Sequence, residues 1–160
     1  MKNNKLSILF LFLTALNCQT ALAYESFSHT TLLLAHEPQN AEPWSKVITT
    51  QEGWESFFYS TLAAATYPVG ESPEAPVLDF ENYQVITGGL GAKPSSGYSL
   101  AVEKVIETDN EMYINIISTS PSSSGECSYL TVITYPTVTI QVKKTDKEIK
   151  YTITPATSGC

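Results

Sequence analysis

The strongest constraint on the fold is the alternation of apolar and polar residues that begins after Gly97. Residues 98–103 start the pattern, and 112–116, 138–142 and 149–153 repeat it. A two-residue period places successive side chains on opposite faces of a β-strand. The pattern therefore predicts a series of antiparallel strands, each with one buried face and one solvated face.

Turn residues and other apolar runs extend this β framework. Asp109–Asn110 and Thr145–Asp146 are typical of turns between strands. Strands are also predicted at Phe27–Ala35, Tyr83–Thr87 and Tyr129–Tyr135, where apolar residues cluster. Prolines, glycines and serines separate these runs, so the chain is expected to turn often.

One helix is predicted ahead of most of the strands. Thr49 is the expected N-cap, and Glu52 follows it at the spacing of a capping box. Four large apolar residues then share one helical face: Trp54, Phe57, Phe58 and Leu62. We therefore expect a mainly β (α+β) protein, either an antiparallel β-sandwich or a partly open barrel, with one N-terminal helix.

The first 23 residues have the pattern of a secretory signal peptide. Two lysines precede the apolar run Leu6–Leu16, and Ala21-Leu22-Ala23 is a small-x-small cleavage site. The apolar run is shorter than the roughly 20 residues that span a bilayer, so stable membrane insertion is not expected. Cleavage after Ala23 would leave a single domain, residues 24–160.

Export predicts a periplasmic or extracellular location, without fixing which. A lipoprotein signal has a small residue before its modified cysteine, whereas Asn17 precedes Cys18 here. We therefore expect Cys18 to be removed with the signal peptide. Cys127 and Cys160 remain, and an oxidising compartment favours a disulfide bond between them.

The charge balance argues against a nucleic-acid partner. Removal of Lys2 and Lys5 leaves 7 lysines against 16 acidic residues, a formal net charge of −9, and the chain contains no arginine. Such a surface repels phosphate backbones and lacks their usual bidentate ligand.

Two loops of small residues look like a partner-binding surface, although their turn chemistry alone favours ordinary turns with no further role. Proline and glycine stiffen and shape such bends, while serine hydroxyls bond to the local backbone. The first comprises Lys93, Pro94, Ser95, Ser96, Gly97 and Tyr98, and the second comprises Pro121, Ser122, Ser123, Ser124 and Gly125. Lys93 and Ser95 are expected to be exposed, whereas the strand phase predicts an inward Tyr98.

An ordered set of short motifs resembles the PrcB family, named for a subunit of a bacterial surface protease complex. The resemblance spans about residues 47–144, and its motifs are Gln51-Glu52-Gly53-Trp54, 76–80, 91–98, Thr119-Ser120-Pro121 with Gly125-Glu126-Cys127, and Tyr135-Pro136. Ser95 and Ser96 replace the Thr and the first Gly of the usual first loop, and the second loop carries two extra residues. The resemblance implies an exported, non-catalytic subunit that assembles with or stabilises a protease.

A second resemblance gives an alternative function. Residues 93–98 are similar to the Asn-Pro-Thr-Thr-Gly-Tyr loop of chagasin-type inhibitors, which plugs the cleft of cysteine proteases. This chain has Lys93 in place of Asn and lacks the Arg-Pro-Trp element of that family. The alternative is therefore a protease inhibitor that acts through this loop. The oligomeric state is open on either reading.

A small secreted enzyme of unknown class is the third and least favoured hypothesis. His29 and His36 are the available general bases, but both lie near the mature N-terminus and no Gly-x-Ser-x-Gly motif is present. The seven-residue spacing of these histidines does not suit a shared metal ion. We therefore expect no catalytic residues, no metal and no cofactor.

Overall fold

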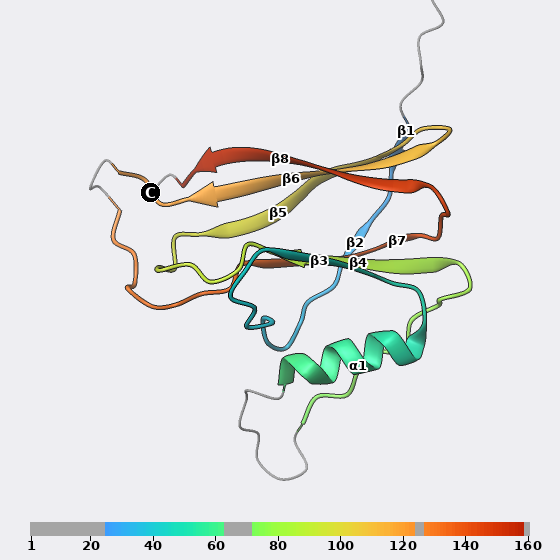
Figure 1. Cartoon of the computed structure of the whole chain (residues 1–160), viewed down its shortest axis with the longest axis horizontal. Coiled ribbons are helices and arrows are strands. Elements are labelled where there is room, and N and C mark those ends of the chain that lie inside the picture. Colours follow the sequence, from blue (N-terminus) through green and yellow to red (C-terminus); the bar gives the residue numbers. More distant parts are fainter. Residues whose placement is uncertain (1–24, 63–71, 124–126, 159–160) are drawn as a thin grey trace, which may run out of the picture.

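The computed structural model describes residues 25–62, 72–123 and 127–158, which form two four-stranded sheets and one helix in three layers (Figure 1). The first sheet has the order β1 (Glu25–Phe27), β5 (Ser99–Glu107), β6 (Glu111–Ser120), β8 (Glu148–Thr157). The second has the order β2 (Thr30–Thr31), β7 (Thr137–Lys143), β4 (Tyr83–Gly89), β3 (Trp44–Ile48). Helix α1 (Gln51–Leu62) covers the second sheet. The predicted signal peptide, residues 1–23, lies outside the described residues.

The alternating pattern correctly predicted the central hairpin. β5 and β6 are antiparallel, and the Thr108 amide donates to the Glu111 carbonyl oxygen at 2.9 Å across the turn at Asp109–Asn110. Three alternate residues of β6 are buried between the sheets: Met112, Ile114 and Ile116. The predicted mainly β fold with one helix is confirmed, and of the two predicted alternatives, sandwich and partly open barrel, the two facing sheets correspond to the sandwich.

One strand pair differs from the antiparallel expectation. β8 runs parallel to β6, with a register from Glu111 opposite Glu148 to Ser120 opposite Thr157. After β6 the chain crosses to the second sheet, runs back as β7, and returns to the first sheet as β8 (Figure 1). The turn after β7 therefore joins two sheets, so β8 has the direction of β6.

Strand β4 contributes to two separate hydrophobic cores because both of its faces are covered. Ile86 belongs to the core between the sheets, which consists of aliphatic residues and one methionine. Its neighbour Val85 belongs to the core between the second sheet and α1, which contains Trp54, Phe57 and Phe58. All the aromatic rings of the two buried clusters are thus on the helix side.

Helix α1 begins one residue later than the capping pattern predicted. The Gly53 amide donates to the Thr50 hydroxyl at 3.1 Å, so Thr50 rather than Thr49 occupies the capping position. The Trp54 indole N–H donates to the carbonyl oxygen of Pro76 at 3.0 Å. This bond holds the segment before β4 across the helix.

Two predicted strands have different structures. The run 27–35 contains only the end of β1 and the short β2, which lie in different sheets. The run 129–135 is part of the connection from β6 to β7 and contains one isolated bridge, between Lys93 and Thr134. Strand β3 was not predicted.

Candidate functional site

The first small-residue loop is bonded along its length to the connection between β6 and β7. The Lys93 amide donates to the Thr134 carbonyl at 2.8 Å, and the Thr134 amide donates back at 2.9 Å. The Thr134 hydroxyl also donates to the Ser95 carbonyl at 2.8 Å. Next along the loop, the Leu130 amide donates to the Ser96 hydroxyl at 3.0 Å, and the Ser96 amide donates to the Leu130 carbonyl at 3.1 Å. These bonds fix the position of the loop, which is a requirement for a preorganised binding surface.

Gly97 brings the two predicted loops together. It is buried, and a Cβ placed on it would lie 2.7 Å from Tyr129 Cδ1 and 2.8 Å from Pro121 Cγ. The Ser122 amide donates to the Tyr129 hydroxyl at 3.3 Å, and the same hydroxyl is hydrogen-bonded to Ser158. The Tyr129 side chain therefore links the first loop, the second loop and the chain after β8.

The predicted site residues differ in their exposure. Pro94, Ser96 and Ser123 are exposed, whereas Gly97 is buried. The remaining described members are half-buried: Lys93, Ser95, Tyr98, Pro121 and Ser122.

Lys93 and Ser95 are less exposed than expected for identifiable reasons. The Lys93 ammonium lies 5.9 Å from the centre of the Tyr98 ring, and the backbones of both residues bond to Thr134. Two members of the second loop, Ser124 and Gly125, lie outside the described residues.

Sequence reasoning missed the apolar part of this site. Leu130, Val132 and Ile133 expose 70%, 47% and 63% of their surfaces beside the first loop. We call the exposed side chains of Pro94, Ser96, Leu130, Val132 and Ile133 the paired-loop surface. Its signal in the sequence was the apolar run at 129–135, which was interpreted as one more strand of the sheet. Exposed apolar side chains on a segment that is bonded to the first loop are candidates for contact with a protein partner.

The two candidate general bases, His29 and His36, are far in sequence from the paired-loop surface. His29 lies between β1 and β2, and His36 follows β2. Within the described ranges, no group of three or more His, Cys, Asp or Glu side chains could hold a metal ion. The one described helix is too short and too polar to cross a bilayer. What the paired-loop surface offers chemically is apolar contact area with hydroxyl groups at its edge.

Comparison with known families supports the resemblance seen in the sequence. Residues 85–143 match the family model described as PrcB C-terminal. The match covers less than half of the chain, but it contains both small-residue loops and the whole connection between β6 and β7. No curated protein and no solved structure was found to match the chain significantly.

Proposed function

Taking the PrcB C-terminal match over residues 85–143 as the premise, we propose that this protein is an exported, non-catalytic binding module that assembles with or stabilises an exported protease. The family takes its name from a subunit of a protease complex. The paired-loop surface lies entirely within the matched residues, so it is the region where a shared binding role is expected.

The exposure of Leu130, Val132 and Ile133 carries this proposal. Full burial of an aliphatic side chain contributes about 1.5–3 kcal/mol, so a partner that covered these three would gain substantial affinity. Because the Ser96–Leu130 and Lys93–Thr134 bonds already hold the backbone, little conformational entropy would be lost on binding.

The inhibitor alternative differs in how the first loop is used. A cleft-plugging loop must project its tip into a protease, whereas this loop is bonded to residues 130–134 and has its Gly97 buried. Pro94 and Ser96 are the members of the first loop that are exposed. This arrangement favours a broad contact surface over a protruding plug.

Export itself is part of the proposal and has a simple test. The protein is expressed from its full-length sequence in a bacterium, and the periplasm and medium are recovered. An exported chain beginning at Tyr24 is the expected product. Retention of residues 1–23, or a lipid-modified Cys18, would contradict this part of the proposal.

The binding surface is tested by capture from the exported proteins of the source cell. We expect a protease, identified by its mass spectrum and its activity, to be retained by immobilised protein. Leu130→Ser and Ile133→Ser should each weaken that retention by about tenfold, since each removes an apolar contact. Val77→Ser is the matched control, because Val77 is 87% exposed in the segment that covers α1.

The same protease separates assembly from inhibition. An assembly partner should leave proteolytic activity intact and slow its loss on heating, whereas an inhibitor should reduce it in proportion to its concentration. If no exported protease is retained, the proposed partner is wrong. If Val77→Ser weakens retention as much as Leu130→Ser, the assigned surface is wrong.

A further inference from the structure

A cavity of about 400 Å³ that opens to solvent lies between the two sheets, separate from the paired-loop surface. Both edge strands β3 and β8 contribute to its wall, and the strands between them supply aliphatic side chains. Its size lies within the range of about 300–1,000 Å³ that is usual for small-molecule sites.

A row of neighbouring residues with little side-chain volume lines the cavity on the second sheet. Gly88 follows Ile86 by two residues on β4 and so shares its inward face. The strand register places Ser45 of β3 and Val138 of β7 on either side of Gly88. This Ser-Gly-Val row supplies little volume between two sheets that pack about 10 Å apart.

The opposite wall is apolar and continuous. Val102 of β5, Ile116 of β6 and Ile153 of β8 form a row in the first sheet, and all three line the cavity. No aromatic side chain belongs to the buried cluster between the sheets, and Tyr151 contributes to the lining from the edge strand β8.

Polar groups lie on the two edge strands. Ser45 is exposed on β3, and Tyr151 is 39% exposed on β8. The Tyr151 side chain is hydrogen-bonded to Ser45, and burial raises the pKa of its phenol. Thr87 is already engaged, because its hydroxyl lies 2.7 Å from that of Thr139.

The described residues that line the cavity include none with a charge. A carboxylate or ammonium head at the Ser45–Tyr151 edge would find no opposite charge among these lining residues, whereas it is stabilised by such a charge where one is present. A hydroxyl or ester head could instead bond to Tyr151 and Ser45 while its chain replaced solvent inside.

We propose that this cavity binds a neutral single-chain amphiphile, with its hydrocarbon chain between the sheets and its polar head between Ser45 and Tyr151. This inference is independent of the proposed protease partner. It assigns the protein a second, lipid-like ligand held by the sandwich interior.

The test is a fluorescence titration of the purified protein, expressed from the full-length sequence, with the neutral probe N-phenylnaphthylamine. We expect enhanced fluorescence that dodecanol displaces well and dodecanoate displaces poorly. Val138→Phe should weaken probe binding by about tenfold or more, since the ring would occupy the cavity. Val77→Phe is the control and should bind like the wild type, because Val77 is exposed elsewhere.

A second variant keeps the test decisive if Val138→Phe fails to fold. Ile153 is 56% exposed, so Ile153→Lys should fold and add a cation at the rim. In this variant, dodecanoate should displace the probe better than it does from the wild type, relative to dodecanol. Three results would each overturn the proposal. The first is a wild type that does not bind the probe, and the second is a folded Val138→Phe variant that binds it undiminished. The third is equal displacement of the probe by dodecanol and dodecanoate, from the wild type and from Ile153→Lys alike.

Discussion

Gly97 lies directly against the ring of Tyr129, with no room between them for a side chain. A Cβ at position 97 would stand 2.7 Å from Tyr129 Cδ1 and 2.8 Å from Cε1. Since Pro121 Cγ is equally close on another side, the ring cannot be the sole group to move. The family-matched region thus contains a glycine whose requirement is steric, set by the meeting of two loops.

Gly97→Ala should destabilise the protein by about 1–3 kcal/mol, the usual cost of overpacking a close contact. It should also weaken partner binding, because the backbone that carries Ser96 and Pro94 would shift. Chemical denaturation measures the first effect and partner retention measures the second. The double variant with Tyr129→Ala should lose less stability than the sum of the two single losses, because the added methyl group no longer meets the ring. A loss equal to that sum would mean that the two residues do not interact as described.

The predicted Cys127–Cys160 bridge gains support from its surroundings, although Cys160 lies outside the described residues. The Ser158 amide donates to the Ser120 carbonyl at 2.9 Å, and Ser158 is hydrogen-bonded to Tyr129, two residues after Cys127. The chain near the C-terminus is therefore held beside the second loop. Closure of this loop should stabilise the fold by roughly 3–4 kcal/mol on the chain-entropy estimate.

Intact mass measured under alkylating conditions tests this bridge. We expect no alkylation of Cys127 or Cys160 before reduction, alkylation of both after it, and a lower unfolding midpoint for the Cys127→Ser, Cys160→Ser double variant. Two thiols that react without prior reduction would contradict the pairing.

The sequence predicted which face of each strand or helix is buried better than it predicted which strands lie side by side. Alternation identified the buried residues of β6, and the spacing of Trp54, Phe57 and Phe58 identified the buried face of α1. A two-residue period cannot say which strand lies alongside, and so the parallel pairing of β8 with β6 was not foreseen. That pairing depends on a crossing between sheets, which leaves no mark in local alternation.

The candidate site was predicted only in part, for a similar reason. The loop residues were recognisable by their turn chemistry, but Leu130, Val132 and Ile133 were interpreted as part of a strand because they belong to an apolar run of residues common in strands. Propensity does not supply a covering layer, and the structure leaves these side chains exposed. An apolar run outside both sheets can therefore be recognised as an exposed surface only once the arrangement of the two sheets and the helix is known.

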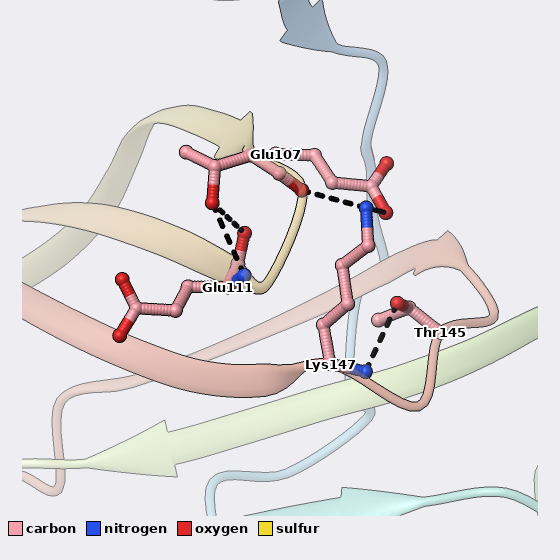
Figure 2. A network of polar contacts seen from close by, with 5 residues as sticks. Glu107, Glu111, Thr145 and Lys147 are labelled. Carbon is pink, nitrogen blue, oxygen red and sulfur yellow. Dashed lines mark hydrogen bonds and ion pairs between the residues drawn. The ribbon is translucent and has the colours of Figure 1, made fainter.

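Lys147 joins the start of β8 to the turn between β5 and β6 (Figure 2). Its ammonium lies 2.8 Å from the Glu107 carboxylate and donates to the Thr108 carbonyl at 2.6 Å. Lys147→Met should cost about 1 kcal/mol of stability, since it removes both contacts from a half-buried group. Glu107→Gln leaves the bond from Lys147 to Thr108 in place, so this variant should lose less stability than Lys147→Met.

Urea unfolding at low and high salt measures this difference. Added salt should narrow the gap between the wild type and Glu107→Gln, because screening weakens the ion pair. Lys104→Met, on the exposed surface of β5, should have little effect. Equal losses for Lys104→Met and Lys147→Met would show that the bridge to the turn contributes nothing.

Glu111 gives a pH dependence whose sign follows from its partners. Hydrogen bonds from Lys150 and then from the Tyr113 hydroxyl lower the pKa of its carboxyl group, and the same pair raises the pKa of Lys150. The folded state therefore holds the Glu111 proton less tightly than the unfolded state does. The pair contributes its full stability above the unfolded pKa of Glu111, and this contribution is lost as the pH falls through the lower, folded pKa. Glu111→Gln should thus be less stable than the wild type at neutral pH and equally stable in strong acid.

Urea midpoints measured from neutral to acidic pH test this prediction, with Glu148→Gln as the matched control. The Glu148 carboxylate lies 3.6 Å from the Lys150 ammonium with a side chain that is 70% exposed, so its loss should matter less. Because Glu148 is opposite Glu111 in the β6–β8 register, both variants remove one charge from the same parallel pair. If the stability difference between the wild type and Glu111→Gln persists unchanged into acid, the charge of Glu111 is not its cause. The side chain would then act through packing, because protonation of the wild type would not change its stability relative to the variant.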